Sequence, residues 1–306
     1  MTLHVKPRLM RPLPALPLEI EQEIFEWRAI SDPSSITVLM RVSRRVRLWV
    51  EPYLYRVIMV GAWPPYSIMK DDILGVTQSK PASFYRDAVR HLYLREVQEP
   101  RFSWSPEVLQ LCSRTHNLAA AGGSANPTLI PILLQMDLRR LSLSLGELFG
   151  GAERIDLKHP LFNYITHLDI FDDIPEADTQ IVPHIAALPV LTHLCMNNHV
   201  PADILRALLS DCPSLNIFVN LWHWYRTPSG RIQARNPPLR DARFVVGVYR
   251  DYAREWEAGA RGEEPDFWTI AEDFVAQKRS GAIPESRYWM VDEDEVEPVN
   301  EDAEDP

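Results

Sequence analysis

The feature that most constrains this chain is a short apolar pattern that recurs about every 25 residues. It has the form apolar-x-x-apolar-x-apolar. Four clear copies are Val89/Leu92/Leu94, Leu138/Leu141/Leu143, Ile165/Leu168/Ile170 and Leu191/Leu194/Met196, and weaker copies are centred on Leu118, Phe218 and Val245. Successive centres are 26, 23, 27, 26, 24 and 27 residues apart. A period of this length predicts stacked units that bury their apolar residues against one another.

Helix-start signals lie between the short strands that this pattern predicts. Three of them, each a capping residue or a proline ahead of a first helical turn, are Ser105-Pro106-Glu107, Asn126-Pro127 and Pro201-Ala202-Asp203. The repeating unit is therefore strand, turn, helix, and its period falls in the roughly 20–29-residue window of leucine-rich repeats. The asparagine or cysteine that usually follows the strand is not regular here. We predict an irregular leucine-rich-repeat-like α/β solenoid over residues 57–247.

Helical segments flank these repeats on both sides. Residues 16–56 predict three short helices, the first with an amphipathic stripe of Ile20, Ile24 and Trp27, and the third ending before Pro52. Residues 248–291 predict a helical cap over the open end of the stack. One face of that cap carries Phe267, Ile270, Ala271, Phe274 and Lys278, and Gly281 predicts where its helix stops. The fold class is mixed α/β.

Charge is concentrated at the C-terminal end. The formal net charge is −10, but residues 292–306 hold nine acids and no base, so residues 1–291 carry only −1. A nearly neutral body predicts no general nucleic-acid partner. We expect residues 1–15 to be an extension and residues 292–306 to be a disordered acidic tail.

Compartment is predicted from three features. No stretch approaches the roughly 18 apolar residues of a membrane span, so no membrane partner is expected. Charged residues and prolines interrupt the N-terminal apolar residues, which argues against a signal peptide. The cysteines, Cys112, Cys195 and Cys212, are odd in number and form no CxxC pair, which fits a reducing compartment. We expect a cytoplasmic or nuclear protein.

The nine histidines invite a metal or catalytic interpretation. His91, His167 and His193 each directly precede the central strand residue of a repeat. Neighbouring strands lie about 4.8 Å apart, so His167 and His193 are able to form a row. Repetition explains such a row structurally, and no carboxylate or cysteine at a suitable spacing completes a zinc set. We predict neither a metal nor a cofactor.

Catalytic motifs are also absent from the sequence. It contains no GxSxG, GxxxxGK[ST], HExxH or GxGxxG. Gly122-Gly123-Ser124 lacks the basic residue of a phosphate loop and predicts a turn. Asp169, Asp172 and Asp173 raise the possibility of a cation site, but without further oxygen ligands in register they predict a polar loop. We expect a protein that is not an enzyme.

The N-terminal helical segment, LPLEIEQEIFEWRAI…SITVLMRVSRRVRLWVEPYLYRV, resembles an F-box. Matching positions are Leu16-Pro17, Glu19-Ile20, Ile24-Phe25 and Val42-Ser43-Arg44-Arg45. The tryptophan that often follows the paired basic residues in F-boxes is Val46 here, and Trp49 lies three positions later. The stretches VRHLYL, HPLFNYITHLDIFDD and FWTIAEDFVAQKRSGAI resemble expanded fungal families of F-box-like proteins.

This resemblance implies a substrate receptor. The F-box would bind the Skp-type adaptor of a cullin-RING ubiquitin ligase, and the repeats would recruit an unknown target protein. Carried over by position, the adaptor-binding residues are Leu16, Pro17, Ile20, Ile24 and Leu39. The alternative is an interaction scaffold whose degenerate F-box does not engage the ligase.

A target surface is expected on the concave face of the solenoid. Side chains alternate along a strand, so residues between the buried positions point out of that face. The predicted target-binding residues are Tyr93, Arg95, Asp169, Phe171 and Asn197. Tyr93, Arg95 and Phe171 are favoured because aromatic and arginine side chains dominate binding hot spots.

Overall fold

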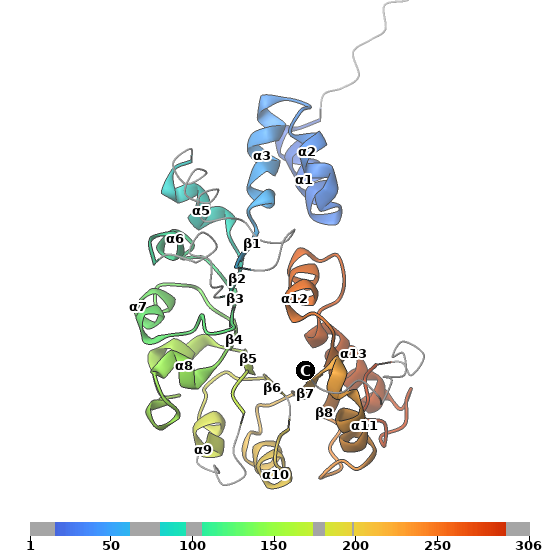
Figure 1. Ribbon diagram of the computed structural model, residues 1–306. Coiled ribbons are helices and arrows are strands. Elements are labelled where there is room, and N and C mark those ends of the chain that lie inside the picture. The colour runs from blue at the N-terminus through green and yellow to red at the C-terminus, as the bar shows by residue number, and fades with distance from the viewer. Residues whose placement is uncertain (1–15, 62–79, 96–105, 174–180, 198, 292–306) are drawn as a thin grey trace, which may run out of the picture. The chain divides into compact units, whose positions relative to one another are not determined.

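The computed structural model describes residues 16–61, 80–95, 106–173, 181–197 and 199–291 (Figure 1). The chain divides into two units, residues 1–54 and residues 55–306. Our expectations for the N-terminal extension and the acidic tail concern residues outside the described ranges. Within those ranges, no helix combines the length and the apolar character that crossing a membrane requires.

The N-terminal unit is helical. Its elements are α1 (Leu18–Ser31), the 3-10 turn η1 (Pro33–Ser35), α2 (Ile36–Leu39) and α3 (Arg44–Leu54). Pro17 precedes α1 and Pro33 opens η1, both places where a missing N–H is tolerated. The prediction that the third helix ends before Pro52 is wrong, because α3 continues to Leu54. Pro52 lies in the last turn, where the chain is about to leave the helix.

The core of this unit is small. It consists of Ala29 from α1, Ile36 from α2, and Val46 and Val50 from α3, with partly buried apolar neighbours around them. An ion pair between Arg45 and Glu21, 2.6 Å long, also links α3 to α1. So few buried residues give such a unit little stability of its own.

The C-terminal unit contains an eight-stranded parallel sheet whose strands follow one another in sequence order. They are β1 (Val57–Val60), β2 (His91–Arg95), β3 (Asn117–Ala121), β4 (Arg140–Leu143), β5 (His167–Ile170), β6 (His193–Asn197), β7 (Ile217–His223) and β8 (Phe244–Tyr249). The predicted strand centres from Leu92 to Phe218 occupy equivalent positions on neighbouring strands. The apolar pattern therefore located these strands correctly.

The last predicted centre is wrong by one residue. Phe218 pairs with Phe244, whereas Val245 pairs with Val219. Because side chains alternate along a strand, this shift reverses the assignment of faces in β8. Phe244 belongs to the main core, and Val245 lies on the opposite side of the sheet.

Short helices cover the convex side of the curved sheet (Figure 1). They are α5 (Ala82–Ala88), α6 (Pro106–Leu111), α7 (Ile130–Leu133), α8 (Leu145–Phe149), α9 (Ile181–Ala186), α10 (Ala202–Asp211) and α11 (Thr227–Arg235). The connecting 3-10 turns are η3 (Pro127–Leu129), η4 (Ala152–Arg154), η5 (Pro160–Tyr164) and η6 (Trp224–Arg226). The predicted helix starts are confirmed at Pro106, Asn126-Pro127 and Pro201. The main core lies between these helices and the sheet.

The last two helices lie on the other, concave side of the sheet (Figure 1). Helix α12 (Tyr252–Arg261) packs on the first strands, and α13 (Phe267–Ser280) packs on β7 and β8. The predicted stop of the last helix is confirmed, because Gly281 adopts the left-handed conformation with φ = 74°. The prediction that this segment caps the open end of the stack holds only for its last residues: the backbone of Val246 on the edge strand β8 exchanges hydrogen bonds with Tyr288 and Met290, whereas the two helices lie on the concave side.

The physical reason is the apolar character of the concave side. Beneath α12 lies a cluster that includes Met59, Tyr93 and Trp256. A second cluster beneath α13 joins strand residues to the helix: Cys195, Ile217, Val219, Leu221, Val245, Trp268, Ala271, Phe274 and Val275. Burying this surface is favourable by roughly 25 cal/mol per Å² of apolar area, so the chain folds back over it.

Lys278 on α13 is an unusual member of this interface. Its side chain is only 2% exposed. The ammonium lies 3.8 Å from the ring centroid of Tyr288 and 3.5 Å from the carbonyl oxygen of Phe244. Burial lowers the pKa of Lys278 from 10.5 to about 8, although Asp241 and Glu285 act in the opposite direction.

We expect Lys278→Met to raise the free energy of unfolding at pH 7 by about 1–2 kcal/mol, because it removes a buried charge and keeps an unbranched side chain of similar length. Below pH 8 the folded wild type holds the charged lysine at a cost. Between pH 8 and 10.5 the folded state releases that proton before the unfolded state does, so the cost declines. The advantage of the variant should therefore shrink over this window. Urea denaturation of both proteins from pH 7 to 10.5 measures it, and a pH-independent difference would contradict the prediction.

Candidate functional site

Helix α1 carries apolar side chains on two opposite faces. Ala29 and Phe25 face the small core of the N-terminal unit. Ile20, Ile24 and Trp27 follow one another at spacings of four and three residues and are exposed. A surface helix normally presents polar residues opposite its core-facing side. The outer stripe of α1 is thus an apolar surface that the described part of this unit leaves uncovered.

Exposed apolar side chains are concentrated in the same unit. Of the seventeen large apolar residues exposed in the described ranges, ten lie between residues 16 and 54. The ten are Leu16, Leu18, Ile20, Ile24, Trp27, Ile30, Val38, Val42, Leu48 and Leu54. Extended exposed apolar surface on a folded unit marks a site of protein–protein interaction.

The predicted adaptor-binding residues do not all lie on this surface. Leu16, Pro17, Ile20 and Ile24 are exposed. Leu39 is half-buried and packs against the core, because α2 is a single turn whose inward side must cover that core. Leu39 therefore packs inside the N-terminal unit and does not lie on the adaptor-facing surface predicted for it.

Trp27 was missed as a candidate for this surface. With 68% of its surface exposed, it is the most exposed of these large apolar side chains. Its position at the spacing of the Ile20 and Ile24 stripe was the signal for it.

The predicted target-binding residues are largely covered. Tyr93, Asp169 and Asn197 are buried, and Arg95 and Phe171 are half-buried. The predicted alternation of side chains is correct, since Tyr93 and Asp169 do lie on the concave side. The expectation that this side is open to a partner is wrong, because α12 and α13 occupy it.

Contacts with α12 account for this burial. The ring of Tyr93 lies 5.6 Å from that of Trp256, and the ring of Phe171 meets that of Tyr252 edge-on at 5.3 Å. The Tyr252 hydroxyl donates a hydrogen bond of 2.7 Å to the carboxylate of Asp169. These side chains therefore hold the C-terminal segment against the sheet.

Asp169 is the centre of a buried polar network. Its carboxylate also accepts a 2.8 Å hydrogen bond from the side-chain amide of Asn197. Burial raises the pKa of Asp169 to about 6, while hydrogen bonds from Tyr252, Cys195 and Asn197 lower it in part.

Asp172 faces elsewhere and caps α8. It accepts hydrogen bonds from the Ser144 hydroxyl (2.8 Å) and from the backbone N–H groups of Leu145 (2.5 Å) and Gly146 (2.8 Å). Asp169 and Asp172 therefore do not combine into a cation site.

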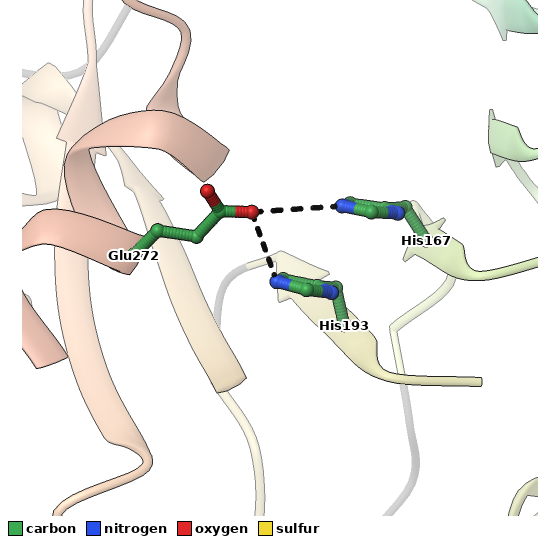
Figure 2. A group of neighbouring side chains, drawn as sticks. All are labelled: His167, His193 and Glu272. Carbon is green, nitrogen blue, oxygen red and sulfur yellow. Dashed lines mark ion pairs between the residues drawn. The ribbon is translucent and has the colours of Figure 1, made fainter. Parts of the chain in front are cut away.

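Two stacked histidines and a glutamate form a separate cluster on the concave side (Figure 2). His167 on β5 and His193 on β6 hold the same register, and their rings are parallel within 4° with centroids 4.0 Å apart. Glu272 reaches them from α13. Its Oε1 atom lies 3.2 Å from Nε2 of His193 and 4.0 Å from Nε2 of His167. The indole of Trp268 meets both rings edge-on.

Threonine hydroxyls orient the two imidazoles. The Thr166 hydroxyl lies 2.9 Å from Nδ1 of His167, and the Thr192 hydroxyl lies 2.8 Å from Nδ1 of His193. Each hydroxyl donates its own proton to a backbone carbonyl, at 3.1 and 3.2 Å. In the tautomer with Nδ1–H, each imidazole donates to the hydroxyl oxygen, and Nε2 of His193 then faces the Glu272 carboxylate as a second acceptor, a contact that a cation between them would stabilise. In the tautomer with Nε2–H, His193 donates to Glu272 directly.

The electrostatic environment keeps both imidazoles neutral. Burial lowers the pKa of His193 to about 4, with a contribution from Arg140. Burial, the neighbouring His193 ring and Arg140 together lower the pKa of His167 to about 2. The guanidinium of Arg140 is paired with Asp266 at 2.7 Å. Two neutral imidazoles and a carboxylate are a donor set that is able to hold a divalent transition-metal ion.

The sequence did not reveal Glu272 as part of this cluster. Spacing alone does not relate it to His193, because α13 was expected at the end of the stack. One signal existed: Glu272 follows Trp268 by one helical turn, so both lie on one side of α13.

An aromatic row lies at the edge of the sheet where the strands end. Consecutive ring centroids along it are 4.2 to 5.6 Å apart, and its members are Phe171, Tyr252, Tyr249, His223 and Tyr225. Its outer end is open, with Tyr225 54% exposed and the adjacent Trp224 46% exposed. Exposed aromatic side chains at such an edge are suited to protein recognition.

Comparison of the chain with protein-family models, with curated proteins and with solved structures finds no match. The residues and their geometry therefore carry the functional proposal.

Proposed function

We propose that this protein is an F-box-type substrate receptor that links a target protein to a Skp-cullin-RING ubiquitin ligase. The N-terminal unit would bind the Skp-type adaptor. The observation that carries the proposal is the outer stripe of α1, which is apolar and exposed directly after Leu16-Pro17. The F-box resemblance falls on the same residues.

The energetics favour a partner for this stripe. Burying one large aliphatic side chain contributes about 1.5–3 kcal/mol. The exposed Leu16, Ile20, Ile24 and Trp27 together offer several times that amount to a protein that covers them. The small core of the unit gains from the same contact, because a bound partner stabilises the folded state by mass action.

We expect Leu16→Ala combined with Pro17→Ala to weaken binding of a purified Skp-type adaptor at least tenfold. The double change removes apolar area at the start of α1, where each large contact is worth about 1–3 kcal/mol. Titration of the adaptor in a calorimeter or on a sensor surface measures the loss. The matched control is Glu23→Ala, an exposed polar residue of the same helix, which should bind as wild type does. Wild-type affinity of the double variant, folded by circular dichroism, would refute the adaptor proposal.

The C-terminal unit would recruit the target. Its strand-and-helix repeats support a leucine-rich-repeat-like solenoid, although its concave side is occupied by α12 and α13. The proposed target surface is therefore the open end of the aromatic row, at Trp224 and Tyr225. Under this proposal the target protein contacts residues that directly follow β7, at the ends of the strands and not on the concave side.

The two surfaces are separable by reciprocal variants. We expect Trp224→Ala combined with Tyr225→Ala to lose one or more captured proteins in affinity purification with mass spectrometry from the native cell, and to retain the adaptor. The Leu16/Pro17 double variant should lose the adaptor and retain those proteins. Both should melt within a few degrees of wild type, because the replaced side chains are exposed. If no captured protein depends on Trp224 and Tyr225, the target surface lies elsewhere.

A scaffold that does not engage the ligase is the second candidate function. The observation that favours it is Val46, which takes the place of the tryptophan found in many F-boxes and is buried in the core of the unit. Trp49, three positions later, is half-buried and packs 6.3 Å from Phe25. For a scaffold, the wild-type protein would capture its partners but would not bind the adaptor.

A further inference from the structure

The cluster of His167, His193 and Glu272 has the chemistry of a metal site. Within the described ranges, it is the group of three or more histidine, cysteine or acidic residues whose ligand atoms converge, all lying within 4.8 Å of one another. The donors are two imidazole nitrogens and one carboxylate oxygen, and Figure 2 shows all three turned toward one point. This is the two-histidine, one-glutamate set that binds Zn²⁺ in several enzymes.

The distances are close to those that a bound ion requires. With Zn–N of about 2.0–2.1 Å, two ligand atoms of a tetrahedral site lie about 3.3 Å apart. The separation of 3.2 Å between Nε2 of His193 and Oε1 of Glu272 already matches this ligand-to-ligand distance. The separation of 4.0 Å between His167 and Glu272 has to close by about 0.7 Å. Glu272 is half exposed, so its side chain has room to move.

One ring has to turn for an ion to bind. A metal lies near the plane of each imidazole that it binds, and the two stacked rings present parallel planes. Rotation about χ2 of one histidine therefore accompanies binding. The motion has a compensating gain, because Nε2 of His167 is buried and makes no hydrogen bond to any described residue. An ion would give that atom a partner.

The surroundings of the cluster support the same conclusion. Metal-binding histidines typically donate the other ring N–H to an oxygen, which fixes the tautomer, and the hydroxyl oxygens of Thr166 and Thr192 lie 2.9 and 2.8 Å from Nδ1, where they would accept that hydrogen bond once Nε2 binds an ion. Trp268 forms an apolar wall beside both rings. Arg140 on β4 is the register partner of His167, and its positive charge would oppose the binding of a cation. The ion pair between Arg140 and Asp266 offsets that charge.

We propose that His167, His193 and Glu272 bind a divalent transition-metal ion, Zn²⁺ foremost, and that the ion fastens α13 to β5 and β6. Three protein ligands leave the fourth position of a tetrahedral ion for a water molecule. Its binding stabilises the arrangement in which the C-terminal helices cover the concave side. This proposal does not depend on the receptor function proposed above.

The test uses the full chain, stripped with a chelator and dialysed. Titration with Zn²⁺ should show one equivalent bound and a melting temperature raised by several degrees, and Co²⁺ should give the visible absorption of a tetrahedral site. Glu272→Gln, His167→Gln and His193→Gln should each weaken Zn²⁺ binding at least tenfold and abolish the Co²⁺ band.

Two control variants should behave as wild type. Asp273→Asn changes the neighbouring acid on α13, and His91→Gln changes the histidine of the same row on β2, whose ring contacts Trp256 instead. If a histidine variant does not fold, Glu272→Gln decides, because that side chain is half exposed. The proposal is overturned if wild type binds no stoichiometric Zn²⁺, or if Glu272→Gln binds it as tightly as Asp273→Asn does.

Discussion

Replacing Trp256 by alanine is expected to lower the free energy of unfolding of the C-terminal unit by about 3–5 kcal/mol, the range for removing a buried tryptophan. Trp256 is buried on α12 and packs against Tyr93, with ring centroids 5.6 Å apart. Val57, Met59 and Ala119 complete the same cluster. The variant would leave a large cavity between α12 and the first strands. Urea denaturation followed by circular dichroism measures the loss.

Trp224→Ala is the matched control for this prediction. It removes the same side chain from an exposed position, so the free energy of unfolding should change by no more than about 0.5 kcal/mol. If Trp256→Ala were as stable as this control, α12 would not be docked on the sheet. The concave side would then be open, as the sequence alone suggested.

The strands could be predicted because their signal is local. Leu141, Leu168 and Leu194 each follow an apolar residue by three positions and precede another by two, and all three are buried against the convex-side helices. One repeat needs nothing from distant parts of the chain to show this pattern. The period then places neighbouring strands in register, which is how the row of His167 and His193 could be foreseen.

The covering of the concave side was harder to predict, because it depends on residues far apart in the chain. A signal existed in the composition of the strands. β1 (VIMV) and β8 (FVVGVY) are apolar at almost every position, which is typical of strands buried on both faces. β4 (RLSL) and β5 (HLDI) alternate with polar residues. The apolar strands at the two ends of the sheet are those on which α12 and α13 pack.

The candidate sites divide in the same way. The spacing of Ile20, Ile24 and Trp27 predicts the apolar stripe of α1 from the sequence alone. Only the structure shows that these side chains are exposed. The cluster at His193 required a helix that returns across the sheet to bring Glu272 within 3.2 Å. Long-range closure of this kind leaves no fixed spacing in the sequence, so motif searches do not detect it.

The second large effect is expected at Asp169. Alanine at this position removes the carboxylate that accepts from the amide of Asn197 and from the hydroxyl of Tyr252; the amide keeps its longer, 3.3 Å hydrogen bond to the carbonyl of Ile170. A buried donor that loses its partner costs about 1–3 kcal/mol, so Asp169→Ala should lower the free energy of unfolding by about 3–5 kcal/mol in total. Tyr252→Phe removes only the hydrogen bond from the hydroxyl and should cost only about 1 kcal/mol.

Asp169→Asn separates the hydrogen bonds from the charge. Its side-chain oxygen still accepts from Asn197, while its NH₂ group donates to the Tyr252 hydroxyl, whose own proton loses its acceptor on residue 169 at a cost of about 1 kcal/mol. It also removes a carboxylate that burial makes costly, as the raised pKa of about 6 indicates. The free energy of unfolding of this variant at pH 7 should therefore be no more than about 1 kcal/mol below that of wild type, or should exceed it. Equal stability of Asp169→Ala and wild type would mean that Tyr252 does not dock on β5. The result also bears on recognition: a loss of target capture in Asp169→Ala that Asp169→Asn restores follows from folding, whereas the Trp224/Tyr225 variant should lose capture with its stability intact.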